Sequence, residues 1–277
     1  MKHDFQRWIE PLIGRAKQAL AAYSSDLFSK SITISRFFEN GMVRLTLLWL
    51  CCTIPLAVWR LSNPASAVHN WGDAAPIFIA YVLVIAAPVA GFFIARDAFL
   101  STKSQVQPSY RFAIVGRWRR LGSESAKANS AYGVVGFMVS LLIGLLLNVV
   151  FRTGEYFLAV PAMNGHAPEW GQAMFLMMTA DVVIMNFFYM ACFVMALRKI
   201  PLFPRMLLFV WSVDIVMQLA VANQIAMAGN VPSTVVEPLV TLLNGNITKV
   251  LISAGVWLPY LILSERVNVT YRHRTAA

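Results

Sequence analysis

Six long apolar segments, joined by loops that alternate between basic and nearly charge-free, constrain this chain more than any other feature. They cover approximately residues 43–59, 74–95, 131–151, 172–197, 206–228 and 235–263. A hydrocarbon core of about 30 Å needs roughly 20 helical residues to cross it. Hydrophobic residues make up 58% of the chain and charged residues only 13%, which disfavours six buried helices in a water-soluble domain. The sequence therefore predicts an all-α fold, a polytopic transmembrane bundle of six helices.

The basic residues fall in alternate connections. Of the 23 Lys and Arg residues, 20 lie in the two chain ends, the second and fourth loops or, as Arg44, just inside the first segment, and the other three are Arg60, Arg152 and Lys249. Basic residues near segment ends are retained in the cytoplasm, so both termini are predicted to be cytoplasmic. The net charge of +10 is then explained by attraction to the anionic leaflet and requires no nucleic acid. No cleavable signal peptide is expected, since the first apolar run begins beyond residue 40.

The remaining regions divide the chain into four parts. In residues 1–40, apolar side chains recur at three- and four-residue steps as far as Leu27, which predicts an amphipathic helix on the cytoplasmic membrane face. Docking of this helix on a partner, or on the protein's own loops, is an equal alternative.

A two-helix addition covers residues 41–95. The loop over residues 96–130 mixes Arg with aromatic residues, and next to a membrane this favours an interfacial helix over single-stranded nucleic acid binding. Residues 131–272 form a four-helix unit.

The last apolar segment closes with a run of aromatic, Pro and polar residues. The run reads Trp257-Leu258-Pro259-Tyr260, then Ser264-Glu265-Arg266-Val267 and Thr270-Tyr271. It resembles the four-helix bacterial membrane family DUF2569, whose last helix closes with Trp-Ile-Pro-Tyr, Ser-x-Arg-Val and Thr-Phe. Leu258, Glu265 and Tyr271 depart from that pattern. The resemblance covers residues 131–272 and implies a bacterial inner membrane location; the family has no established activity to carry over.

The same run also has a physical interpretation. Trp257 and Tyr260 are amphipathic rings of the kind that anchor at the membrane boundary. Arg266 would reach lipid phosphates or helix-terminal carbonyls on the cytoplasmic side. We therefore expect an interfacial anchor rather than a ligand site.

Three ionisable residues lie well inside the predicted spans: Asp181, Asp214 and Lys249. A charge at the bilayer centre costs at least about 2.5–3.5 kcal/mol, so such residues face the bundle and pair, or line a wet cavity. At 1.5 Å per residue, Asp181 and Lys249 lie at similar depths and are predicted to pair. The other members of the predicted intramembrane polar network are Asn186, Gln218, Asn246 and Ser253. Such residues either hold helices together or line a path for a proton, ion or small solute.

No catalytic, metal or cofactor site is predicted. The histidines are scattered over both sides, at His3, His69, His166 and His273, without the spacing of metal ligands. The cysteines lie within apolar segments, at Cys51, Cys52 and Cys192. The methionines of the fourth segment are irregularly spaced and favour packing over copper binding. No strand and no Gly-rich phosphate loop is expected.

These patterns support two hypotheses for function. The leading one is a non-enzymatic accessory or structural component that packs against other membrane proteins through its helices and basic cytoplasmic face. Gly133, Gly136 and Gly144 are expected at a close helix contact, because small side chains let backbones approach. The alternative is a small transporter or channel that uses Asp181, Asp214 and Lys249. A water-filled cavity that reaches the depth of Asp181 and Lys249 would support transport, and a dry, closed pair there would contradict it.

Overall fold

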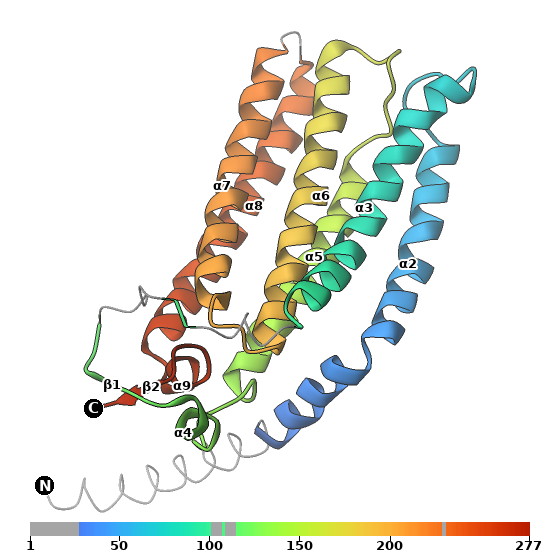
Figure 1. The fold of residues 1–277 in the computed structure, drawn as a ribbon. Coiled ribbons are helices and arrows are strands. Elements are labelled where there is room, and N and C mark those ends of the chain that lie inside the picture. The colour runs from blue at the N-terminus through green and yellow to red at the C-terminus, as the bar shows by residue number, and fades with distance from the viewer. Residues whose placement is uncertain (1–27, 101–106, 109–114, 229–230) are drawn as a thin grey trace, which may run out of the picture.

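The computed structural model describes residues 28–100, 107–108, 115–228 and 231–277. Within these ranges, six helices are long and apolar enough to cross a membrane. They are α2 (Met42–Ser62), α3 (Trp71–Ala98), α5 (Phe137–Ala159), α6 (Glu169–Leu197), α7 (Phe203–Met227) and α8 (Ser233–Leu263) (Figure 1). The prediction of an all-α bundle with six long apolar helices is confirmed, and the chain is a multi-pass membrane protein.

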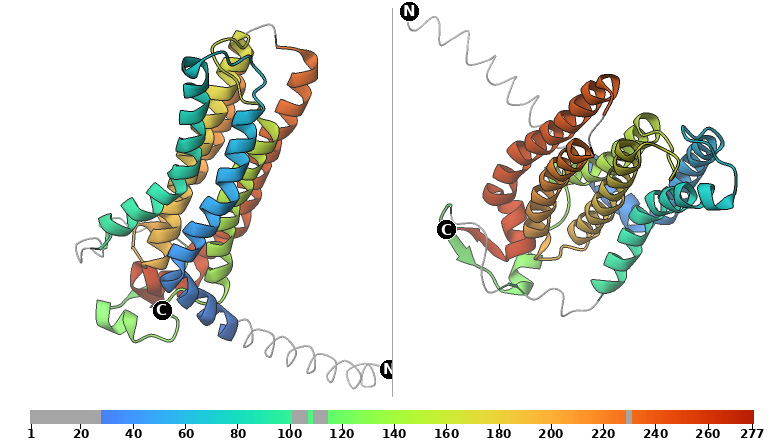
Figure 2. Two further views of the ribbon diagram at one scale, coloured as in Figure 1. Left: turned by 90° about the vertical axis from the view of Figure 1, so that its right-hand side faces the viewer. Right: turned by 90° about the horizontal axis from the view of Figure 1, so that it is seen from above.

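Helix α6 is the central element of the bundle. It packs against α3, α5 and α7, while α8 packs mainly on α7 and α2 mainly on α3. The view from above in Figure 2 shows α6 between α3 and α7. Of the six long helices, α6 has the largest buried share, and α2 and α8 have the smallest. A helix that is apolar around most of its circumference is the expected occupant of this position.

Local sequence explains several helix ends and one close contact. Asn70 caps α3 by accepting a hydrogen bond from the backbone N–H of Asp73, a role that Asn favours. Pro204 lies in the first turn of α7, where its missing N–H leaves no helical bond unmade. Helices α3 and α6 approach closely at Gly91, where an added Cβ would lie 2.6 Å from the carbonyl oxygen of Phe187.

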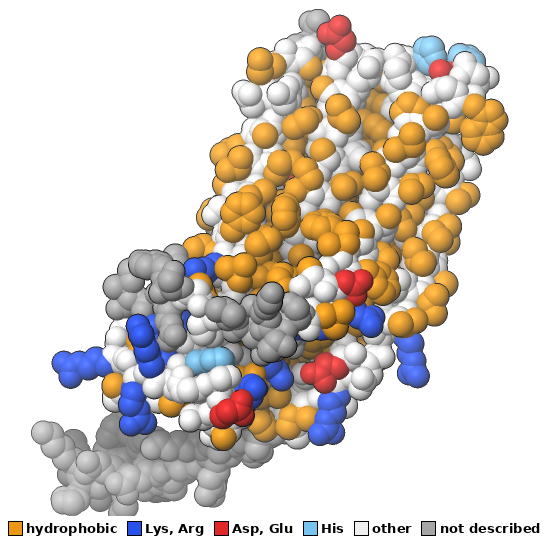
Figure 3. Space-filling model, viewed as in Figure 1, with side chains coloured by type: hydrophobic (Ala, Val, Ile, Leu, Met, Phe, Trp, Pro, Cys, Tyr) orange, Lys and Arg blue, Asp and Glu red, His pale blue; other side chains and the backbone are white. Residues whose placement is uncertain are grey.

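The end of the bundle that carries the C-terminus has a small cap of its own. It consists of α4 (Ser123–Lys127), α9 (Glu265–Arg272) and a two-stranded antiparallel sheet of β1 (Trp118–Arg120) and β2 (Arg274–Ala276). The expectation of no strands is wrong, because two strands of three residues each are too short to show an alternating pattern. Figure 3 shows Lys and Arg side chains gathered around this end, and apolar side chains over most of the remaining surface.

Most of the predicted N-terminal amphipathic helix, residues 1–27, lies outside the described residues. Residues 28–40 are helical and pack on the base of the bundle. The backbone N–H of Gly136 donates to Ser31 Oγ at 2.7 Å, and the ring of Phe38 meets that of Phe193 edge-on at 5.3 Å.

One difference in helix bounds matters for function. The third apolar segment was predicted to end at Phe151, but α5 continues to Ala159. Arg152 and Glu155, expected in a loop, therefore lie inside a membrane-spanning helix. Hydropathy ended the segment at its first charged residue, because it takes no account of partners that other helices supply.

Candidate functional site

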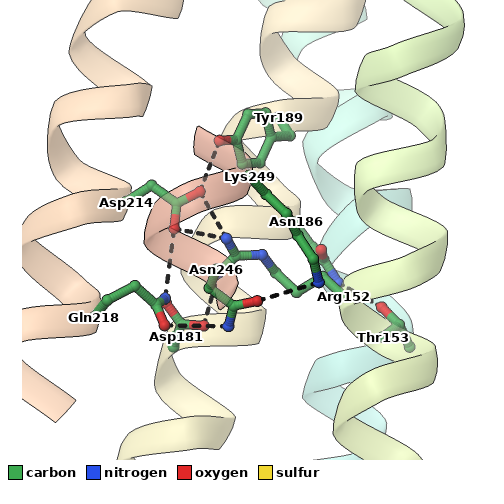
Figure 4. A network of polar contacts seen from close by, with 9 residues as sticks. All are labelled: Arg152, Thr153, Asp181, Asn186, Tyr189, Asp214, Gln218, Asn246 and Lys249. Carbon is green, nitrogen blue, oxygen red and sulfur yellow. Dashed lines mark hydrogen bonds and ion pairs between the residues drawn. The ribbon is translucent and has the colours of Figure 1, made fainter. Parts of the chain in front are cut away.

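Arg152 of α5 joins three helices through two buried ion pairs (Figure 4). Its Nη1 donates to Asp181 Oδ2 of α6 at 2.7 Å, and its Nη2 lies 2.6 Å from both Oδ1 and Oδ2 of Asp214 on α7. Arg152 is 8% exposed, Asp181 1% and Asp214 0%. A guanidinium suits this role because its fork of N–H donors can serve two carboxylates at once.

The two acids are not equally supplied with donors. Asp214 also accepts a hydrogen bond from Tyr189 Oη at 2.7 Å. Gln218 Nε2 lies 3.0 Å from Asp181 Oδ1 and 3.5 Å from Asp214 Oδ1. Asp214 therefore receives donors from three side chains and Asp181 from two.

The network continues from Gln218 to α8. Asn246 Nδ2 donates to Gln218 Oε1 at 3.2 Å, and Lys249 Nζ lies 3.5 Å from Asn246 Oδ1. Lys249 also forms an ion pair with Glu155 of α5. The side chains of Lys249 and Glu155 are 54% and 37% exposed. A chain of contacts thus leads from a fully buried acid to a half-exposed ion pair.

The half-exposed pair lines a hollow between α5 and α8. The hollow has a volume of about 460 Å³ and is lined by Gly144, Leu147, Asn148, Phe151, Arg152, Glu155, Asn246, Lys249 and Val250. The Oδ1 atom of Asn148 is buried and has no hydrogen-bond partner among the described residues. An acceptor of this kind needs a donor from water or from a bound molecule.

A second hollow adjoins the first half of α8, and the seam between α5 and α8 is filled at its base. The second hollow, of about 710 Å³, lies between residues 234–242 of α8, the loop after α5 and the start of α6. Leu242 lies one helical turn before Asn246. At the other end, the ring of Phe137 lies 4.7 Å from that of Trp257 and 5.0 Å from that of Tyr260. The aromatic cluster closes the seam toward the end that carries the C-terminus.

Within the protein, the predicted interfacial anchor joins helices. Trp257 and Tyr260 are half-buried against Phe137 of α5. Arg266 Nη1 donates to the backbone carbonyl of Ala131 at 3.3 Å, which lies in the turn between α4 and α5 and not at a helix end. Anchoring to lipid stays a prediction.

The predicted pairing of Asp181 with Lys249 is wrong, because each has another partner on α5. The prediction compared depths along the helices only among residues within the predicted spans, and Arg152 and Glu155 were assigned to a loop. Asn186 Nδ2 donates to Thr153 Oγ1 at 2.7 Å, beside the network. Among the described residues, Ser253 makes no side-chain hydrogen bond with the network.

The three glycines predicted at a helix contact have other positions within this chain. Gly144 lines the hollow, and nothing lies within 4 Å of a Cβ placed there. Gly133 and Gly136 precede α5 and have φ angles of +112° and +64°, a backbone conformation that glycine adopts most easily. A contact of these glycines with another protein stays a prediction.

Sequence reasoning missed Arg152, Glu155 and Tyr189 as members of the site. One signal was available for the first two. The predicted spans contained two acids, Asp181 and Asp214, but only one cation, Lys249. Because buried acids require partners, a second cation was needed nearby. The next charged residues along the chain after the third apolar segment were Arg152 and Glu155.

Two histidines from separate loops meet at the opposite end of the bundle. His166 Nε2 lies 3.1 Å from Asp73 Oδ1, and the rings of His69 and His166 are 5.8 Å apart. From the sequence, His69 and His166 were expected to be scattered. In the described part of the chain, no group of three or more His, Cys, Asp or Glu side chains is placed to hold a metal ion.

Comparisons of the chain with models of protein families, with curated proteins and with solved structures found no match. The resemblance to the DUF2569 family therefore stays a prediction, and the geometry of the site must carry the functional argument.

Proposed function

We propose that the protein is a small membrane transporter or channel in which the hollow between α5 and α8 admits a polar solute to the charged network. The observation that carries this proposal is that the hollow reaches Arg152, Asn246 and Lys249. Lys249 lies about 21 Å along α8 from its end at Leu263, near the middle of the helix. Ionisable residues at such a depth that face a cavity are typical of solute and ion pathways.

The exposure of the ion pair separates this proposal from a purely structural role. Residues that only hold helices together can bury all their charges, as Arg152, Asp181 and Asp214 do. Lys249 and Glu155 instead keep about half and a third of their side-chain surface open. Charges exposed to hydrocarbon are costly, and water or a polar solute in the hollow would remove that cost.

In this proposal the end rich in Lys and Arg faces the cytoplasm of a bacterial inner membrane. The concentration of basic side chains around α4, α9 and the strands supports that orientation. The resemblance of residues 131–272 to DUF2569 supports the location.

Thiol labelling tests whether the hollow is hydrated. Asn148→Cys is introduced after Cys51, Cys52 and Cys192 are replaced by Ala, and the protein is reconstituted in lipid vesicles. A charged, membrane-impermeant methanethiosulfonate is expected to modify this cysteine, because the reagent reacts with thiolates in water. The matched control is Leu251→Cys, an exposed apolar position on α8 outside the hollow, which is expected to stay unmodified. Equal inertness of both cysteines would show a dry hollow and overturn the proposal.

The accessory component is a second candidate, favoured by the large outer surface of α2 and α8, each with only 17% of its apolar window buried. A partner's helix over the seam between α5 and α8 would shield Lys249 and Glu155 from lipid. In that case Asn148→Cys is protected in native membranes and becomes reactive after purification in mild detergent. The proteins that remain bound under those conditions are then identified. Equal reactivity in both preparations, with a protein that purifies alone as a monomer, would exclude this candidate.

A further inference from the structure

We propose that Asp181 binds a proton, and that the hydrogen-bonded chain through Gln218 and Asn246 links this proton to the hollow. The inference deepens the proposed function and rests on it in one respect: the proton becomes the coupling ion of the transport cycle only if the hollow carries a solute. Proton binding itself rests on the charges and contacts of the network.

The first argument is a charge imbalance. The network contains the cations Arg152 and Lys249 and the acids Asp181, Asp214 and Glu155. Among the described residues, the ion pairs bring no other cation to these three acids. One carboxylate is therefore in excess in a region of low dielectric, where an uncompensated charge neutralises by taking up a proton.

The second argument assigns the proton to one acid. Glu155 is half-exposed and paired with Lys249, so water and a cation both stabilise its charge. Asp214 accepts from Arg152, Tyr189 and Gln218, a donor set that favours the ionised form. Asp181 is equally buried but has fewer donors. It is the acid that gains most from protonation.

The third argument is that the Gln218 amide can serve both the ionised and the protonated form of Asp181 by exchanging the positions of its oxygen and nitrogen. Its Oδ1 lies 3.0 Å from the Gln218 amide. The amide nitrogen donates to the ionised acid; after a half-turn of the amide group, its oxygen accepts the O–H of the protonated acid. The two ends of an amide have nearly the same shape, so either orientation fits the same space. The turned Gln218 amide presents its nitrogen to Asn246, so the Asn246 amide, which lines the hollow, must turn as well to accept from it.

A metal cation is a poorer occupant than a proton. Both oxygens of Asp181 already face N–H donors, Arg152 Nη1 and Gln218 Nε2, and these would repel a cation. Metal ions also need several oxygen ligands around them.

Helix α3 packs on α6 as well, and its Tyr81 ring contacts Tyr156 and Phe175. The charged and titratable groups around Asp181 are Arg152, Tyr189 and Asp214, and Lys249 and Glu155 join the network through Asn246.

Infrared difference spectroscopy of the full-length protein at neutral pH tests proton binding directly. The wild type is expected to show the C=O band of one protonated carboxylic acid, shifted in D₂O, and Asp181→Asn should lose it. Asp97→Asn, which removes an exposed acid outside the network, should leave the band unchanged. Arg152→Gln removes a cation and should add a second protonated carboxyl, which keeps the inference testable if Asp181→Asn does not fold. Absence of the band in the wild type, or its persistence in Asp181→Asn, would overturn the proposal.

A flux measurement separates this inference from the proposed function. Vesicles that contain the protein and a pH-sensitive dye are given an acid pulse, and proton entry is compared between wild type and Asp181→Asn. Faster entry in the wild type, lost in the variant, supports proton coupling. A carboxyl band without proton entry retains proton binding and overturns the link from Asp181 to the hollow. Proton entry without the band overturns Asp181 as the site and retains transport.

Discussion

Arg152 Nη2 lies 2.6 Å from both carboxylate oxygens of Asp214, so a single guanidinium nitrogen connects α5 to α7. Both helices pack on α6, and Nη1 of the same side chain is bound to Asp181 of α6. One side chain thus ties together three of the four helices that surround the network. Its removal leaves two acids facing one another without a cation.

Arg152→Leu is therefore expected to destabilise the protein by about 3–5 kcal/mol, the usual result of breaking a buried ion pair. Thermal unfolding in detergent measures this effect. Arg44→Gln, at an exposed position of α2, is the matched control and should change stability by less than about 0.5 kcal/mol.

A compensating variant checks the cause of that loss. If the stranded acids are responsible, Arg152→Leu combined with Asp181→Asn and Asp214→Asn should recover most of the stability, because buried ion pairs can often be replaced by neutral residues. No recovery in the triple variant would show that shape, not charge, is what Arg152 provides.

Gly91→Ala should destabilise the contact between α3 and α6 by about 1–3 kcal/mol, because the new Cβ meets backbone that cannot move aside. Gly144→Ala is the comparison: its Cβ would enter open space, and Ala gains about 0.5–1 kcal/mol over Gly within a helix. Opposite shifts of the melting temperature are expected, and equal shifts would contradict the close approach at Gly91.

Tyr271→Phe should cost about 1 kcal/mol, because the buried hydroxyl of Tyr271 donates to the carbonyl of Ala196 at 2.8 Å. The measurement is the melting temperature at neutral pH. Thr275→Val, which removes an exposed hydrogen bond to Glu265, is expected to have a smaller effect.

Tyr271→Phe is also expected to change how the stability of the fold depends on pH. Burial raises the pKa of Tyr271 well above its usual value of 10.0, so above pH 10 the folded protein retains a proton that the unfolded chain loses. Stability therefore falls as the pH rises above about 10, and Tyr271→Phe should lose less stability over that range. Arg272, whose pKa is lowered to about 10 by burial and by Arg274 and Arg205, acts in the opposite direction but equally in both proteins. Parallel pH curves would contradict a buried hydroxyl.

Trp257→Ala should open the base of the hollow. Gly144→Cys in the cysteine-free protein is expected to react with the impermeant reagent from the side that carries the C-terminus only when Trp257 is also removed. Trp71→Ala, at an exposed position at the other end of the bundle, should leave the labelling unchanged. Reaction of Gly144→Cys without removal of Trp257 would show that the aromatic cluster does not close the seam.

Apolar character predicts the spans of this fold well, because each helix must offer about 20 apolar residues to cross the bilayer. It also identifies Asp181, Asp214 and Lys249 as the residues that need partners. Which partners they find depends on which helices are neighbours and on how each helix is turned, and hydropathy contains neither. Arg152 was therefore assigned to a loop, although it lies at the centre of the site.

The cap at the base was less predictable for a related reason. Its strands join Trp118–Arg120 to Arg274–Ala276, and four membrane-spanning helices separate these two segments in the chain. No local sequence pattern predicts the pairing of two strands that are so far apart in the chain. The sequence run that closes the last apolar segment singled out Arg266 and Tyr271. Their bonds to Ala131 and Ala196 depend on tertiary structure and could not be predicted from that run.

The cap also has a consequence for how the protein is assembled. Gly133, just before α5, donates its backbone N–H to Thr270 Oγ1, and Leu121 donates to the carbonyl of His273. The partners of the segment that precedes α5 are thus synthesised only after the sixth span has left the ribosome. Until then, α5 enters the membrane with its charged residues and without the segment that fastens its base. Insertion of α8 therefore completes the network, and a chain interrupted before α9 would contain the network without the cap that fastens the base of α5.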